Sequence, residues 1–321
     1  MKLWQKAMIG LARSERITGF VQSRETFRGL VHRFVGGEST TEALKAALRL
    51  RAEGITSSLF FLGEYVEDPA IIAATIDQLG WIAGQLATAD LDIHLSVDPT
   101  QLGLLTSPAT CTGNVVQLAE TVAGVVPGGR ARPGRDALML DMEDRSVTQY
   151  TLGLHDQLQD AGLPTAITIQ GYLHRTLDDV ARLAARGAWV RLVKGAFAEP
   201  GQVAVRKRKE IDTRYRQVVA ALMSPTALDA GTYNAFGTHD HLIIEEILAL
   251  ADQHGWKRDR FEFEMLYGVR PELQSNLVRR GYRVRLYVPF GHDWFPYAIR
   301  RVGESPRNLR FAVGAMAKGT R

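Results

Sequence analysis

The sequence predicts an α/β protein that folds as a closed (β/α)8 barrel of the TIM type, preceded by N-terminal helices. Two observations carry this prediction. Short apolar runs of strand length recur between about residue 57 and residue 288, and helix-like stretches separate each run from the next. Strands that alternate regularly with helices form parallel sheets, and eight such units close into a barrel of roughly 250 residues. The 321 residues of the chain therefore suit one large domain.

The N-terminal region predicts helix rather than strand. Apolar residues from Phe20 to Phe34 recur at helical spacings, and the pattern resumes after a pair of glycines. We therefore predict a helical segment over residues 1–52 and the barrel over residues 53–321.

The eight strands are predicted from apolar runs that Gly, Pro or polar residues bound. They cover residues 57–62, 93–97, 137–140, 166–169, 189–193, 233–236, 261–266 and 284–288. Residues 127–135, rich in Gly, Pro and Arg, predict a surface loop before the third strand. An open doubly wound sheet is the alternative, but residues 62–66 after the first strand lack the Gly-x-Gly-x-x-Gly turn that receives a pyrophosphate.

Composition and charge exclude several classes of protein. The chain is 45% hydrophobic, and its 39 basic and 35 acidic residues give a net charge of +4, which excludes a disordered chain and a nucleic-acid binder that works by charge excess. Cys111 is the only cysteine, so a disulfide framework and a multi-cysteine metal site are excluded. It also lacks an obvious base that would make it a nucleophile.

Localisation is predicted from what the sequence lacks. The N-terminus has no cleavable signal pattern, and no window approaches about 18 uncharged apolar residues. We expect a cytoplasmic protein. The slight basic excess leaves open a peripheral contact with an anionic membrane surface.

Polar side chains follow most of the predicted strands, where barrel enzymes place their active sites. Arg191 and Lys194 lie in or just beyond an apolar run, where an unpaired cation is costly. Their position predicts an anionic partner, either a phosphate group or the acidic cluster at Asp141. The strand-end set is Asp98, Asp141, Glu143, Asp144, Gln170, Arg191, Lys194, Thr238, His239, His241, Tyr267 and Tyr287.

The last helical stretch offers a site for a small carboxylate. Helical spacing places Tyr297 beside Arg300 and Arg301, and Glu304 one turn below both arginines. A guanidinium group matches the two oxygens of a carboxylate, so adjacent arginines suit bidentate capture. An ordinary surface ion pair is the alternative.

A metal-dependent hydrolase is a competing hypothesis. His239 and His241 resemble the paired histidines of metal-dependent barrel hydrolases, and Asp98 and Asp141 could supply further ligands. A histidine beside a strand end is more often a hydrogen-bonded structural group or a cofactor contact, so we predict no metal site.

Several segments, taken together and in order from about residue 40 to residue 312, resemble the motifs of the proline dehydrogenase family. They are Leu62-Gly63-Glu64, Ser96 to Gly103, Asp141-Met142-Glu143-Asp144, Val190 to Ala196, Gly237-Thr238-His239-Asp240, Phe261 to Gly268, Tyr287-Val288-Pro289, and Arg300-Arg301 with Glu304. The resemblance implies an FAD-dependent barrel enzyme that oxidises L-proline to 1-pyrroline-5-carboxylate by hydride transfer to flavin N5. It also implies a membrane quinone as the electron acceptor.

The resemblance also implies roles for individual residues. Arg300 and Arg301 would clamp the substrate carboxylate. The cofactor contacts would be Gln170, Arg191, Lys194, Gly195, Ala196, Thr238, His239 and Glu304. The pocket would also contain Asp98, Asp141, Leu266, Tyr287 and Tyr297, with Glu304 bracing the arginines.

Two positions depart from the family pattern. Asp98 stands where a lysine is usual, and Phe197 stands where a tyrosine is usual. A negative charge near the arginine pair weakens carboxylate binding unless Asp98 pairs with Arg301 or turns away. These departures leave open a proline analogue or other cyclic amine as the substrate, and a flavin-binding barrel without catalytic activity.

Overall fold

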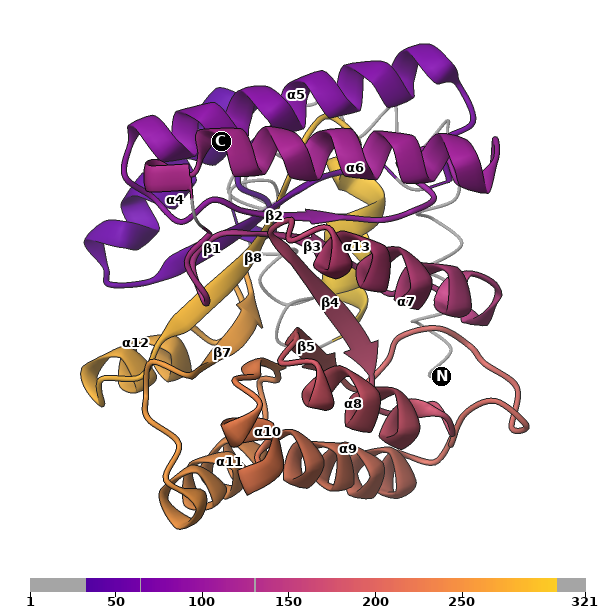
Figure 1. The fold of residues 1–321 in the computed structure, drawn as a ribbon. Helices are drawn as coiled ribbons and strands as arrows, with labels where there is room; N and C mark the ends of the chain where they lie inside the picture. The colour runs from indigo at the N-terminus through magenta and orange to yellow at the C-terminus, as the bar shows by residue number, and fades with distance from the viewer. Residues whose placement is uncertain (1–32, 64, 130, 305–321) are drawn as a thin grey trace.

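The computed structural model describes residues 33–63, 65–129 and 131–304 and shows a closed barrel of eight parallel strands (Figure 1). Each strand pairs with its neighbours in chain order, and β8 closes the barrel on β1. The predicted fold class is therefore confirmed, and so is each predicted strand to within two residues at either end. The strands are β1 Thr56–Phe61, β2 His94–Val97, β3 Ala137–Leu140, β4 Thr165–Gln170, β5 Trp189–Val193, β6 Tyr233–Gly237, β7 Phe261–Leu266 and β8 Val284–Phe290.

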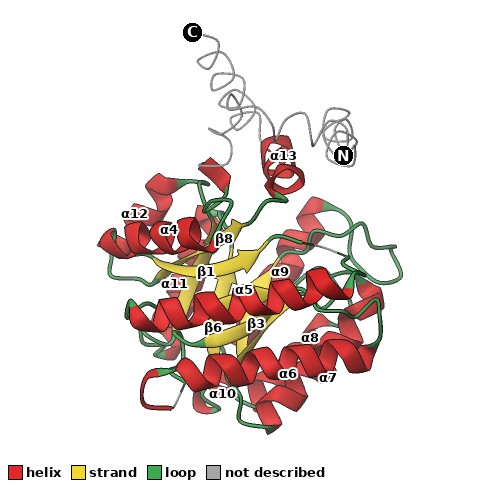
Figure 2. Cartoon of the chain, turned by 90° about the horizontal axis from the view of Figure 1, so that it is seen from above, coloured by secondary structure: helices red, strands yellow, loops and turns green. Residues whose placement is uncertain are grey.

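Helices surround the barrel, and α13 lies apart from this ring (Figure 2). Several helices begin at a capping side chain, as α7 does at Asp144 and α11 at Asp240, where the carboxylate accepts a backbone N–H of the first turn. The helices are α4 Thr40–Ala52, α5 Pro69–Thr88, α6 Pro108–Val125, α7 Arg145–Asp160, α8 Thr176–Ala185, α9 Arg208–Leu222, α10 Pro225–Asp229, α11 His241–His254, α12 Pro271–Arg279 and α13 Trp294–Glu304.

The hydrophobic core lies between the strands and the helices. Outward side chains such as Leu59, Leu138 and Val190 are fully buried there against the helices. The inward side chains of the barrel include the buried polar residues Ser58, Ser96 and Arg191, beside a small separate apolar cluster. The barrel interior therefore contains buried polar and charged groups that lead to the site.

Helix α5, over Pro69–Thr88, is the one described helix that is long and apolar enough to cross a membrane by length and composition, although Asp77 interrupts its apolar sequence. Its inner face, including Ile72, Leu79 and Leu86, packs into the barrel core. Length and composition alone are weak indications, because a core helix passes the same test.

The N-terminal segment is described from Arg33 onward. Helix α4 confirms the end of the predicted helical segment, and the earlier predicted helix lies outside the described residues. Phe34 and Val35 pack against Phe60 of β1 and the aromatic residues of α13. The division into segments 1–52 and 53–321 stays a prediction.

Candidate active site

The carboxyl ends of the strands bring the predicted side chains to one end of the barrel. Asp98 follows β2, Asp141 follows β3, Lys194 follows β5 and His239 lies two residues beyond β6. Gln170 and Leu266 are the last residues of their strands, and Tyr287 lies in β8. We call this end of the barrel the mouth.

Arg191 is the centre of a buried network that leads to the mouth. Its side chain is 3% exposed and crosses the barrel axis from β5. Nε and Nη2 donate to the two carboxylate oxygens of Glu264 at 2.7 Å each, and Nη1 donates to Asp141 Oδ1 at 2.5 Å. Nη2 also lies 3.1 Å from Ser58 Oγ and 2.9 Å from Ser96 Oγ. The anionic partner predicted for Arg191 is thus the acidic cluster and not a phosphate.

Asp141 connects Arg191 to Tyr287 at the mouth. Its Oδ1 also accepts from Thr168 Oγ1 at 2.8 Å, and its Oδ2 accepts from the Tyr287 hydroxyl at 3.0 Å. The Tyr287 ring stacks on Phe60 and lies 5.3 Å from the Arg191 guanidinium. Burial, together with the nearby carboxylates of Asp141 and Asp98, raises the pKa of Tyr287 well above its ordinary value. Tyr287 therefore remains a hydroxyl that donates to Asp141.

Sequence reasoning missed Glu264, which lies inside β7 and is 3% exposed. Burial raises its pKa, while the Arg191 guanidinium opposes that rise. The available signal was a charged residue inside an apolar strand, because such a residue needs a partner of opposite charge at the same level of the barrel. Arg191 already showed that need in the sequence.

Lys194 also has carboxylate partners. Its Nζ donates to Asp212 Oδ1 at 2.5 Å and lies 3.8 Å from Asp240 Oδ2, and its side chain is 31% exposed. The next residue, Gly195, has φ +111°, and a Cβ there would lie 2.2 Å from the Tyr172 ring. Only glycine fits this turn at the mouth. Ala196 follows it and is exposed.

Gln170 keeps an unused acceptor at the mouth. It is 2% exposed, and its amide nitrogen donates to the carbonyl oxygens of Met142 and Glu143 at 3.2 and 2.6 Å. Its Oε1 is buried and has no hydrogen-bond partner within the described part of the chain. A buried carbonyl of this kind normally accepts a hydrogen bond, so Oε1 suits an N–H of a bound group.

His239 is a neutral side chain beside the mouth. The backbone N–H of Leu266 donates to its Nε2 at 3.0 Å, so the neutral ring carries its proton on Nδ1. Burial, and then the charges of Arg301 and Arg270, lowers the pKa of His239 to about 4. Thr238 is buried, and its Oγ1 accepts from the Asp240 N–H at 3.1 Å.

Helix α13 covers the end of β1 and carries the two predicted arginines. Its Trp294, Phe295 and Tyr297 pack with Phe60, and Tyr287 packs at the edge of the same cluster. The Arg301 guanidinium lies 5.1 Å from the centre of the Tyr297 ring. This contact agrees with the predicted pairing of an aromatic ring and an arginine, and Tyr297 shares its hydrophobic cluster with Tyr287.

The other predicted positions on this helix are described less fully. Arg300 and Arg301 are both partly exposed. Glu304 is the last residue of α13, and its side chain lies outside the part of the chain that is described.

The two departures from the family pattern lie at the same end of the barrel. Asp98 is partly exposed after β2 and close enough to Tyr287 to affect its pKa. Phe197 lines a surface hollow with Glu199 and Arg145. Glu199 is buried and binds the side chain of Arg145 at 3.1 Å, which ties the loop after β5 to the start of α7.

The geometry does not support the competing metal site. The described residues contain no group of three or more His, Cys, Asp or Glu side chains placed to hold a metal ion. Nε2 of His239 accepts a backbone N–H, and His241 is exposed at the start of α11. The metal-dependent hydrolase therefore has no ligand set in this part of the molecule.

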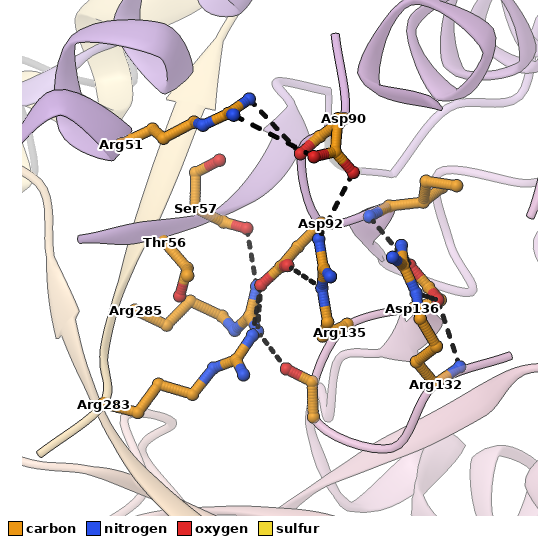
Figure 3. A network of polar contacts seen from close by, with 12 residues as sticks. Arg51, Thr56, Ser57, Asp90, Asp92, Arg132, Arg135, Asp136, Arg283 and Arg285 are labelled. Atoms are coloured by element: carbon orange, nitrogen blue, oxygen red, sulfur yellow. Dashed lines mark hydrogen bonds and ion pairs between the residues drawn. The ribbon is translucent and has the colours of Figure 1, made fainter. Parts of the chain in front are cut away.

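A second buried arginine network closes the opposite end of the barrel, which we call the base (Figure 3). Arg285 of β8 is fully buried, and it donates to Glu262 at 2.7 Å and to Asp92 at 3.1 Å. It also donates to the backbone carbonyls of Ser57 and Gly134 at 2.8 and 2.7 Å.

Further arginines complete the base. Arg283 binds Asp92 and also Glu262, while Arg135 binds Asp92 at 2.8 Å. Beside them, Arg132 Nε donates to Asp136 Oδ2 at 2.6 Å. Burial opposes ionisation of Asp92, but Arg285 and Arg283 hold its pKa below the ordinary value.

Comparison with known proteins gives a single family. Residues 43–313 match the family described as proline dehydrogenase. A proline dehydrogenase of Deinococcus radiodurans is 33% identical over 320 residues, which cover 99% of each chain. Proline dehydrogenase 2 of Bacillus subtilis is 30% identical over 286 residues, which cover 89% of this chain and 90% of the relative.

Solved structures similar to this chain have the same fold. Proline utilization A from Bdellovibrio bacteriovorus, inactivated by N-propargylglycine, has a TM-score of 0.76 and 22% identity over 98% of this chain. This chain spans 40% of the length of that protein. A proline utilization A variant from Bradyrhizobium japonicum has a TM-score of 0.69 and 20% identity. At this identity the likeness supports the fold alone.

Proposed function

This chain belongs to the proline dehydrogenase family, and we propose that it oxidises L-proline to 1-pyrroline-5-carboxylate with FAD bound across the mouth of the barrel. Membership of this family makes the chain a proline dehydrogenase, which is an oxidoreductase. The arrangement of the mouth supports the proposed reaction with FAD. Arg191, Asp141 and Tyr287 form a polar chain beneath the mouth, and Arg301 of α13 lies over Tyr297, whose aromatic cluster also includes Tyr287.

The residues at the mouth fit a flavin. The buried Oε1 of Gln170 accepts an N–H, and the neutral His239 offers its Nδ1–H as a donor. Lys194 is partly exposed and shared between two carboxylates, so a phosphate can compete for it. Gly195, Ala196 and Thr238 would supply backbone and hydroxyl contacts. Arg191 would lie beneath the cofactor, since its N–H groups are engaged by protein acceptors.

The chain's own residues would hold the substrate. Arg300 and Arg301 bind the carboxylate, because two guanidinium groups match two carboxylate oxygens. Tyr287, Leu266 and Tyr297 form the walls that orient the ring and exclude water. FAD would supply the hydride acceptor at this position, so no protein nucleophile is needed. Solvent can accept the proton that the amine releases.

Asp98 supports a second candidate substrate. A carboxylate at the end of β2 adds negative charge to the mouth, which favours a cationic amine and weakens binding of a carboxylate. A proline analogue or another cyclic amine would meet this charge better than L-proline. A flavin-binding barrel without catalytic activity is the remaining alternative.

The electron acceptor and location complete the proposal. A membrane quinone would receive the electrons, with the enzyme cytoplasmic and in peripheral contact with the inner face of the membrane. The family and the net charge of +4 support these two points.

Flavin content and steady-state kinetics test the proposal together. We expect purified protein to carry FAD, or to bind it after reconstitution, and to reduce an artificial electron acceptor in the presence of L-proline. Flavin binding with turnover of an analogue alone would favour the second candidate. Protein that neither contains nor binds FAD would contradict the proposal.

A further inference from the structure

Glu264 is the buried charge at the mouth to which neither the family motifs nor the predicted site assigns a role. We propose that Glu264 is a positioning residue for the reaction: it fixes Arg191, and through Arg191 it fixes Asp141 and the Tyr287 hydroxyl in the pocket wall. This inference rests on the proposed function, because Tyr287 matters only where the substrate binds at the mouth.

The hydrogen bonds run in sequence from Glu264 through Arg191 and Asp141 to Tyr287. Glu264 takes Nε and Nη2 of Arg191 as a bidentate pair, at 2.7 Å each. This grip fixes the plane of the guanidinium and leaves Nη1 for Asp141 Oδ1 at 2.5 Å. The other oxygen of Asp141 is then free to accept from Tyr287 at 3.0 Å.

The burial of each member makes the chain stiff. Glu264 and Arg191 are each 3% exposed, and the serine hydroxyls of β1 and β2 close the far side of the guanidinium. Water cannot replace a lost partner at this depth, so a change at Glu264 must be met by movement of Arg191. Asp141 is then the remaining carboxylate partner of Arg191 among the described residues, and a stronger pull of Arg191 on Asp141 weakens the bond from Asp141 to Tyr287.

The charges of Glu264, Asp141 and Arg191 also support a positioning role for Glu264. Glu264 and Asp141 carry two negative charges against the one positive charge of Arg191, so the chain beneath the mouth has a net negative charge. Glu264→Gln removes that excess without changing the size of the side chain. It also sets an amide N–H against a guanidinium N–H, where no hydrogen bond forms.

Glu262 offers a matched control. It lies two residues earlier on the same strand, is fully buried, and holds Arg285 as Glu264 holds Arg191. Its network ends at the base on backbone carbonyls and Asp92, with no contact with the mouth among the described residues. Both variants break a buried ion pair, but only Glu264→Gln changes one that reaches the substrate pocket.

The test compares Glu264→Gln, Glu262→Gln, Tyr287→Phe and the double variant Glu264→Gln/Tyr287→Phe. For Glu264→Gln we expect kcat/KM for proline to fall roughly 10- to 100-fold, mainly through KM, and the flavin midpoint potential to rise. Glu262→Gln should lower the melting temperature. In the folded enzyme, however, the KM for proline should stay within about twofold of the wild-type value, and the flavin midpoint potential should not shift. The double variant should be no worse than the poorer single variant, because both changes break one chain.

Crystallography of the flavin-free Glu264→Gln protein gives a readout independent of activity. We expect Tyr287 and Asp141 to lie beyond hydrogen-bond distance in it. If this variant fails to fold, Thr168→Val tests the same chain, since Thr168 donates to the same Asp141 oxygen as Arg191. We expect a smaller rise in KM from that change.

Three results would overturn the positioning role. The first is a loss of kcat/KM in the double variant equal to the product of the two single losses. The second is a Tyr287–Asp141 hydrogen bond that persists in the crystal structure of Glu264→Gln. The third is an equal kinetic effect of Glu262→Gln and Glu264→Gln. A wild-type protein that binds FAD poorly or turns over no proline would instead contradict the proposed function. The crystallographic readout would still decide whether Glu264 fixes Tyr287.

Discussion

Each end of the barrel contains a buried pair of an arginine and a glutamate, but the two pairs differ in what they stabilise. At the base, Glu262 and Arg285 form a fully buried pair, and the other hydrogen bonds of Arg285 go to Asp92 and to backbone carbonyls. At the mouth, Glu264 and Arg191 form a similar pair, but the chain continues through Asp141 to the partly exposed Tyr287.

The difference between them is where each network ends. The base network ties together the starts of β2, β3, β7 and β8 and ends inside the protein, so it holds the barrel closed. The mouth network ends on the hydroxyl of the partly exposed Tyr287, where the proposed substrate would bind. In barrels of this type, residues at the base serve stability and residues at the mouth serve catalysis.

His94 lies between the two networks. It is fully buried on β2, and its Nδ1 lies 2.9 Å from Ser58 Oγ, which in turn receives a hydrogen bond from Arg191. Burial, with the charges of Arg285 and Arg191 on either side, lowers the pKa of His94 well below its ordinary value. A neutral ring therefore lies between the two buried arginines, and the charges of Glu262 and Arg285 still influence the pKa of Glu264.

The largest expected effect is at the base. Glu262→Ala leaves Arg285 without its main counter-charge in the barrel interior, so the free energy of unfolding should fall by about 3–5 kcal/mol. Urea unfolding measures this loss. The KM for proline of the remaining folded enzyme should stay near that of the wild type, and a KM change as large as the one expected for Glu264→Gln would erase the distinction between base and mouth.

The next effect is at the mouth. Changing either Arg300 or Arg301 to Met removes a charge-assisted fork worth about 1.5 to 3 kcal/mol per bond, so the KM for proline should rise roughly 10- to 150-fold. Stability should change little, because both side chains are partly exposed. Steady-state kinetics and thermal unfolding together check the prediction, and an unchanged KM would place the carboxylate clamp elsewhere.

Acidic pH should destabilise the enzyme through histidines that the fold keeps neutral. The pKa of His239, and that of buried His155, is lowered from 6.5 to about 4, in each case chiefly by burial. Between pH 6.5 and about 4 the unfolded chain binds more protons than the folded one, so stability is complete above pH 6.5 and falls as pH drops through this window.

The size of this acid effect is on the order of 1 to 3 kcal/mol per histidine. Urea unfolding at a series of pH values measures it, and His239→Gln should make the pH dependence shallower because one of the histidines that the fold keeps neutral no longer titrates. An unchanged slope in that variant would show that His239 is not kept neutral by the fold.

The smallest predicted effect concerns Asp98. If its charge opposes the substrate carboxylate, Asp98→Asn should lower the KM for proline a few-fold, consistent with about 1 kcal/mol for a partly exposed pair of charges. Steady-state kinetics with L-proline and with a cyclic amine that lacks the carboxylate provide the check. A higher KM for proline in Asp98→Asn would show instead that Asp98 helps to hold the substrate amine.

The fold was predictable because the parallel strands are buried on their outer faces. Side chains such as Leu59, Leu95 and Leu138 are fully covered by helices, so even short strands appear in the sequence as apolar runs. The strand-end rule then identified Asp141, Gln170 and His239 without any structure, because parallel strands all end at the same side of the barrel.

The pairing inside the barrel was not predictable. Arg191 signalled a need for an anion, but its main partner, Glu264, lies 73 positions later in the sequence. Arg285 and Glu262 also lie inside apolar strands, but the sequence analysis assigned them no role, although each is fully buried. Which inward side chains meet across the axis depends on the stagger of the closed barrel, and that stagger is a property of the whole sheet.

An anaerobic absorption spectrum, recorded before and after the addition of L-proline, tests the central claim most directly. The account predicts that the purified protein shows the visible absorption of oxidised flavin and that proline bleaches it, while Arg301→Met requires far more proline for the same bleaching. A colourless protein that binds no added flavin, or a flavin band that neither proline nor a cyclic amine bleaches, would contradict the account.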